Sequence, residues 1–148
     1  MPTETFTAVS KKLAKGLAVE STARTFKMIL DEPKNLGGTD TGMNPVEALL
    51  CALGSCQAIV AAAFAKANNI EFSEFWVELE GDLDPDGFLK GKPGVRNGFS
   101  EIRTKMHIAT DADEAKVKAF AEFIEGRCPV GDTITNGTTI NNSIVIEG

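Results

Sequence analysis

The chain of 148 residues contains no tyrosine, a single histidine and three cysteines. His107 is the one histidine, and the chain has no Cys-x-x-Cys pair. The ligands of a structural zinc site would be hard to assemble from these residues, so we expect no metal. The odd number of cysteines also argues against a scaffold held by disulfides. We interpret the three thiols as core residues or reactive groups in a reducing compartment.

The chain also lacks a basic surface and a recognisable leader. Its formal net charge is -6, and such a surface repels phosphate backbones and anionic membranes. We therefore expect no nucleic-acid partner and no membrane partner. The first ten residues contain no basic stretch followed by an apolar run, which predicts no signal peptide and a cytoplasmic location. The uncharged stretch 48–65 is rich in alanine and is broken by Gly54, which favours a core helix over a membrane span.

Short strands and turns are predicted for residues 5–31. Phe26, Met28 and Leu30 alternate with their neighbours, and this period of two is typical of a β-strand. Residues 36–42 are rich in glycine and short polar side chains, so we expect a loop. The glycine spacing does not fit a phosphate-binding loop.

A long helix is predicted to follow this loop. Asn44 is a good N-cap and Pro45 suits the first helical position, so the helix is expected from Pro45 to about Lys66. Asn68 and Asn69 suit its end, because asparagine tolerates the left-handed conformation. The helix is apolar almost all round, which predicts burial on every side by a sheet or by a second subunit.

The C-terminal half is predicted to add two strands and a second helix, which together give one domain over residues 1–148. The pattern as a whole indicates an α+β fold with a mostly antiparallel sheet. The predicted segments are a strand at 74–82, a turn at 84–87, a loop at 88–98, a strand at 102–108, a helix starting at Asp111 or Asp113 and ending near Gly126, and a final strand at 143–147.

Two segments carry the residues best suited to chemistry. One is 44–56, with the sequence NPVEALLCALGSC, which ends on Cys56; the other is Cys128 followed by Pro129 at a predicted helix end. In this order and setting they resemble the OsmC/Ohr family, in which a central helix carries the peroxidatic cysteine and a Cys-Pro pair carries a second one. The resemblance extends over essentially the whole chain.

The resemblance implies a fold, an assembly and a reaction. The fold is a mostly antiparallel sheet wrapped around a buried central helix in an intertwined homodimer. The reaction is the reduction of organic hydroperoxides, with hydrogen peroxide as a further candidate, in defence against oxidative stress and without a cofactor. Cys56 would form a sulfenic acid, Cys128 would condense with it to a disulfide, and an external dithiol would restore both thiols.

Such a reaction needs a thiolate, and an unperturbed thiol titrates near about 8.5, so a cation must lower the pKa of Cys56. The family supplies an arginine from the region before the cysteine helix. Arg24 is the one arginine there and takes this role by position, with Arg96 and Arg103 as alternatives. Because a buried arginine needs a partner, Glu47 is the expected carboxylate.

The carboxylate departs from the family pattern. Better-known family peroxidases have a glutamate directly after the helix proline, whereas Val46 stands there in this chain and Glu47 is one residue later. That offset rotates the side chain by about 100°. Glu47 and Cys56 leave the helix on roughly opposite sides, so Glu47 either serves the site of the partner chain or stabilises the helix N-terminus.

Some of these residues, and the protein as a whole, also have interpretations without catalysis. Cys51 has no counterpart that matters in the family, and we expect it to be a core residue. His107 is expected on the wet face of its strand. The alternative function is a family member that is not a peroxidase and uses the same pocket to bind a small apolar or thiol-containing molecule.

Overall fold

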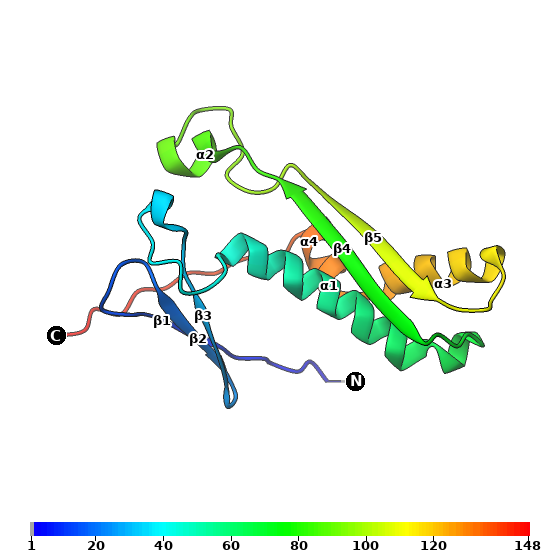
Figure 1. The fold of residues 1–148 in the computed structure, drawn as a ribbon. Helices are drawn as coiled ribbons and strands as arrows, with labels where there is room; N and C mark the ends of the chain where they lie inside the picture. The colour runs from blue at the N-terminus through cyan, green and yellow to red at the C-terminus, as the bar shows by residue number, and fades with distance from the viewer. Residues whose placement is uncertain (1) are drawn as a thin grey trace. The chain divides into compact units, whose positions relative to one another are not determined.

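The computed structural model describes residues 2–148, and Figure 1 shows the order of its helices and strands. The chain forms two compact units, one up to Cys51 and one from Ala52. The division falls inside the long helix α1 (Pro45–Phe64), so each unit contains part of this helix.

The first unit contains a small antiparallel sheet in the order β1-β2-β3. Its strands are β1 (Val9–Lys12), β2 (Val19–Ala23) and β3 (Phe26–Leu30), so the predicted strands are confirmed. Arg24 and Thr25 form the two-residue turn between β2 and β3, and Arg24 has a left-handed φ of 56°, as tight hairpin turns require.

The glycine-rich loop is organised by Asp31, which is 2% exposed. Its carboxylate accepts hydrogen bonds from the backbone N–H and the hydroxyl of both Thr39 and Thr41. The hydrogen bond from Thr39 is the largest of the effects that hold the pKa of Asp31 far below its ordinary value. A Cβ on Gly38 would lie 1.9 Å from the carbonyl oxygen of Glu32, so glycine alone fits there. The predicted loop is confirmed, and it opens with one 3-10 turn (Lys34–Leu36).

Helix α1 begins where the sequence predicts. Asn44 Oδ1 accepts the backbone N–H of Glu47 at 2.8 Å, and Glu47 Oε1 accepts the backbone N–H of Asn44 at 2.9 Å. This reciprocal pair is a capping box. The helix ends at Phe64, slightly earlier than predicted, and Asn69 closes the following 3-10 turn (Lys66–Asn68) in the left-handed conformation.

Within the second unit, β4, β5 and α3 bury one side of α1, and the cover by a second subunit stays a prediction. One face is buried, whereas Leu49 is 39% exposed and Ile59 is 66% exposed on the other. Among residues 2–148, α1 is the one helix that is long and apolar enough to cross a membrane by length and composition, a property that core helices of soluble proteins share. The buried face consists of Leu53, Gly54, Gln57, Val60 and Ala61.

The second unit packs α1 against two long antiparallel strands and helix α3 (Glu114–Arg127), as Figure 1 shows. The strands β4 (Glu74–Asp82) and β5 (Glu101–Ala109) pair along their whole length, and both were predicted within one residue. Their inner face packs on the core, which contains Val60, Ala61, Ile70, Phe120 and Ile124.

Two short helices replace segments predicted as irregular. Helix α2 (Pro85–Lys90) lies where a turn and loop were expected. The helix forms because Asp84 caps its start by accepting the N–H of Asp86 at 3.0 Å, and Gly91 ends it with a φ of 60°. Helix α4 (Pro129–Asn136) follows Cys128, where the sequence predicted only the end of α3. In both helices a proline at the first position fixes the backbone for a helical turn.

The final strand predicted at 143–147 is not formed. These residues have no regular secondary structure, and Ile144 and Ile146 are 89% and 91% exposed. A strand requires a hydrogen-bonded neighbour, and the described chain provides none for this segment.

Candidate active site around two thiols

Cys56 and Cys128 come from distant parts of the chain and meet in the second unit. Cys56 lies on α1, is half-buried and packs against the hydrophobic core. Cys128 joins α3 to α4 and is 1% exposed. Both thiols are free.

The start of α4 is built around Cys128. Its sulfur accepts the backbone N–H of Gly131 at 3.3 Å, so the thiol caps the helix. A Cβ on Gly131 would lie 3.5 Å from Cys128 Sγ and 3.6 Å from Leu53 Cδ1, which places α1 directly against this turn. Helix N-termini carry a partial positive charge and favour a thiolate beside them.

Cys128 influences the titration of Cys56. Burial is the first cause that raises the pKa of Cys56 above its ordinary value, and its hydrogen bond and charge interaction with Cys128 raise it further. The backbone N–H of Val130 in the first turn of α4 acts in the opposite direction. No cation of residues 2–148 is among the groups that shift this pKa.

Arg24 and Glu47 both belong to the first unit. The Arg24 guanidinium lies over the ring of Phe26, with 4.8 Å between Cζ and the ring centroid. Glu47 is engaged in the capping box with Asn44, which agrees with its expected role at the helix N-terminus. Their roles toward the thiols therefore remain predictions.

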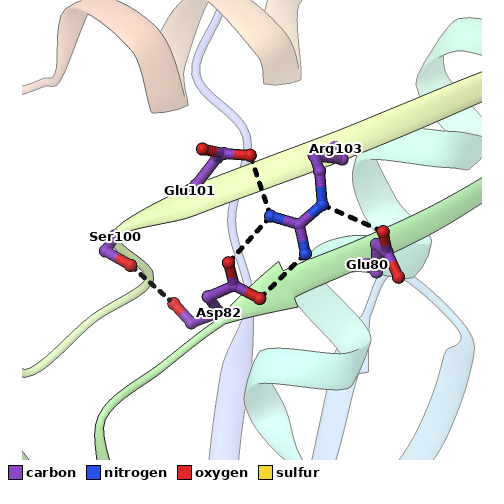
Figure 2. Close-up of polar contacts among 5 residues, drawn as sticks. All are labelled: Glu80, Asp82, Ser100, Glu101 and Arg103. Carbon is purple, nitrogen blue, oxygen red and sulfur yellow. Dashed lines mark hydrogen bonds and ion pairs between the residues drawn. The ribbon is translucent and has the colours of Figure 1, made fainter.

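Arg103, one of the alternatives, is held by carboxylates on the outer face of β4 and β5, as Figure 2 shows. Its guanidinium bonds to Glu80 at 2.9 Å, to Asp82 at 2.7 and 2.8 Å, and to Glu101 at 2.8 Å. Three carboxylates thus neutralise this cation on the side of the hairpin that faces away from the core. Arg96 lies in the segment between α2 and β5.

Arg127 was not considered in the sequence analysis, although it directly precedes Cys128. Its guanidinium lies between two rings, 4.6 Å from the centroid of Phe123 and 5.2 Å from that of Phe64. A cation at the last turn of α3 also suits the negative helix C-terminus. The position next to Cys128 in the sequence was the one signal that could have drawn attention to it.

The remaining thiol and the histidine lie on exposed surfaces. Cys51 is exposed and its sulfur lies 3.9 Å from that of Met43, so the expectation of a core residue is wrong. Its face of α1 has no cover in the described chain. His107 lies on the outer side of the hairpin, as expected, where it stacks on Trp76 and its Nε2 lies 2.5 Å from Glu78 Oε2.

The α+β fold with antiparallel sheets matches the structures of OsmC-like proteins. The sequence profile of the OsmC-like protein family matches residues 38–143, and the chain belongs to this family.

The chain is also similar to two curated proteins and to a solved structure. A hydroperoxide reductase of Mycoplasma genitalium is 26% identical over 135 residues, which covers 87% of this chain and 88% of that protein. A hydroperoxide reductase of Mycoplasma pneumoniae is 28% identical over 113 residues and covers 74% and 72%. The crystal structure of an OsmC-like protein from Mycoplasma pneumoniae superposes with a TM-score of 0.78 at 23% identity, covering 88% of this chain and 87% of that one.

Proposed function

We propose that this protein is a thiol-dependent peroxidase that reduces organic hydroperoxides, with hydrogen peroxide as a further substrate. The observation that carries the proposal is the meeting of Cys56 and Cys128 at the start of α4, where Cys56 lies within hydrogen-bonding reach of Cys128 and the sulfur of Cys128 caps the helix. The similarity to proteins named hydroperoxide reductase supports the same substrate class.

The proposed reaction has two steps on the protein. The Cys56 thiolate attacks the distal oxygen of the hydroperoxide, the O–O bond breaks, and the leaving alkoxide takes a proton to become an alcohol. Cys56 is then a sulfenic acid, whose sulfur is attacked by Cys128 with loss of water to give a disulfide. An external dithiol reduces the disulfide by thiol exchange. The half-buried sulfur of Cys56 suits the first step better than Cys128, which is 1% exposed.

The raised pKa of Cys56 sets a requirement for this reaction. Since burial disfavours the thiolate, a nearby cation has to offset it at neutral pH. We assign this role to Arg24, oriented by Glu47, within the assembled protein. The amide of Val130 at the start of α4 adds to the stabilisation of the Cys56 thiolate, whereas the amide of Gly131 binds the sulfur of Cys128.

The assembled protein is proposed to be a homodimer. Ile59 on α1 is 66% exposed, and Phe26 and Met28 on β3 are 62% and 53% exposed. Apolar side chains this exposed in regular structure indicate a surface that another chain covers. Light scattering at micromolar concentration should give twice the monomer mass, and a monomer would contradict the assembly. The C-terminal residues exposed in the same way are Ile140, Ile144, Val145 and Ile146.

The peroxidase proposal is tested by following the consumption of cumene hydroperoxide and hydrogen peroxide with a dithiol present. Wild type is expected to turn over, Cys56→Ser to be inactive, and Cys128→Ser to react once and then stall or over-oxidise. Turnover retained in Cys56→Ser would reject the mechanism. Cys51→Ser is the matched control, because it removes an exposed thiol from the same helix.

A second function is favoured by one observation, the raised pKa of Cys56 together with Val46 at the position of the family glutamate. A site whose thiols stay protonated suits reversible binding of a small apolar or thiol-containing molecule. Thiols that titrate at or above their ordinary value in the assembled protein, with no peroxide consumption, would support this binding function over catalysis.

A further inference from the structure

Gln57 has an unusual environment for a polar residue. It follows Cys56 in α1 and is 5% exposed, and its Oε1 is buried without a hydrogen-bond donor among residues 2–148. A carbonyl oxygen that has lost water and gained no donor destabilises the fold. A methionine would fill the same volume without that penalty. The carboxamide therefore indicates a donor that arrives from outside the described chain.

Helix geometry relates Gln57 to the thiols through Leu53. Leu53 lies three residues before Cys56 and four before Gln57, so it is a neighbour of each of them on the surface of α1. Leu53 reaches the turn at Gly131, where its Cδ1 and the sulfur of Cys128 flank the same point at 3.6 and 3.5 Å. Gln57 thus lies one helical turn after Leu53, the residue through which α1 meets the turn at Cys128.

We propose that the carboxamide of Gln57 binds the hydroperoxide beside the thiol pair, with Oε1 accepting a hydrogen bond from the O–H group of the substrate. This inference deepens the proposed peroxidase function and rests on it. It assigns to Gln57 the recognition of the O–H group of the hydroperoxide.

The chemistry of the first step explains why an acceptor suits this place. The distal oxygen carries the hydrogen, and the Cys56 sulfur attacks this oxygen. The electron pair of the O–O bond leaves with the alkoxide, which takes a proton from water. The distal oxygen keeps its own hydrogen and becomes the S–OH group of the sulfenic acid. The same O–H can therefore stay bound to Gln57 before and after the oxygen changes partner.

The test compares Gln57→Met with wild type in two reactions of Cys56. Oxidation by cumene hydroperoxide presents an O–H donor, whereas methyl methanethiosulfonate modifies the thiol and has no donor. The peroxide rate constant is expected to fall about tenfold, as the loss of one hydrogen bond would cause. The methanethiosulfonate rate should stay the same, and the thermal unfolding midpoint should be equal or higher because the orphan oxygen is gone. Leu53→Met is the matched control, since it introduces the same side chain on the same face without removing a polar group.

Four outcomes would overturn the inference. Equal loss in both reactions would show that Gln57 only maintains packing, and an unchanged peroxide rate would show that it takes no part. The same selective loss in Leu53→Met would assign the effect to the helix face as a whole. A changed oligomeric state with unchanged selectivity would assign the missing donor to a second copy of the chain. If wild type consumes no hydroperoxide at all, the peroxidase function itself fails, which is distinct from an active wild type with an unaffected Gln57→Met.

Discussion

The guanidinium of Arg103 and the carboxylate of Asp82 form two parallel hydrogen bonds across β4 and β5, at 2.7 and 2.8 Å (Figure 2). Paired bonds of this kind fix both the position and the orientation of the arginine. The hydrogen bond from Arg103 lowers the pKa of Asp82, so the carboxylate stays charged and the pair persists in mildly acidic solution. Arg103 is thereby committed to the outer surface of the hairpin.

Because Arg103 is bound by carboxylates, Arg24 and Arg103 are expected to differ in their effect on Cys56. Replacing Arg24 with glutamine should slow the oxidation of Cys56 by hydroperoxide about tenfold or more, because an adjacent cation lowers a thiol pKa by about one to three units. Arg103→Gln removes an arginine engaged with three carboxylates and should leave this rate unchanged. Stopped-flow measurement of both variants at pH 7 distinguishes them. Equal rates for Arg24→Gln and wild type would remove Arg24 from the site.

Cys128→Ser should lower the pKa of Cys56. The hydrogen bond and the charge of Cys128 both raise that pKa, so their removal leaves burial as the raising effect and the Val130 amide as the lowering one. The rate at which methyl methanethiosulfonate modifies Cys56 should therefore reach its half-maximum at a lower pH than in the parent. Parent and variant both carry Cys51→Ser, so that the exposed third thiol does not react. A midpoint that is unchanged or higher would contradict the coupling of the two thiols.

Gly54→Ala should stabilise the protein less than Gly126→Ala, because the side chain of Leu79 must move to make room for the new Cβ. This Cβ would lie 2.6 Å from Cδ1 of Leu79 on β4. Gly126→Ala is the matched control in α3, where nothing lies within 4 Å of the new Cβ. It should stabilise the protein by about 0.5–1 kcal/mol, because alanine is the better helix former. Urea unfolding of both variants measures the difference, and equal effects would refute the close approach.

Asp31→Asn should weaken the fold at neutral pH and flatten its response to acid. The pKa of Asp31 is lowered in the folded protein, so its carboxylate stabilises the fold above its ordinary pKa of about 4, and this stabilisation is lost as the pH falls further. Urea unfolding between pH 7 and pH 3 should show a steeper acid loss in wild type than in Asp31→Asn. Asp40→Asn, in the same loop but exposed, should resemble wild type. Parallel pH profiles for wild type and Asp31→Asn would reject the role of this carboxylate.

Local sequence signals predicted much of the fold. The start of α1 follows from Asn44 and Pro45, and the long strands follow from alternation, because these signals act between residues close in sequence. The same rules missed α4, since Pro129 is compatible both with the end of one helix and with the start of the next. The final strand at 143–147 could not be predicted reliably, because a strand depends on a neighbour that its own residues do not specify.

The site was less accessible to sequence reasoning. Cys56 and Cys128 were paired through a family resemblance, since no spacing rule brings residues so distant in the sequence together. The burial of Cys51 was misjudged because an apolar helix does not reveal which of its faces the chain covers. The partners of Arg103 depend on the register of β4 and β5, and Gln57 was not singled out because its orphan oxygen is a property of the packed core.

The sulfur of Cys128 has two competing uses. In the reduced protein it is the acceptor that secures the first turn of α4 through the N–H of Gly131. In the disulfide this sulfur is bonded to Cys56, and the fixed geometry of that bond would turn it away from the N–H of Gly131, so oxidation would weaken this cap. In the proposed cycle, residues 128–136 would then be less ordered in the oxidised protein than in the reduced protein. Faster amide hydrogen exchange there would report that the oxidised protein is ready for its reductant.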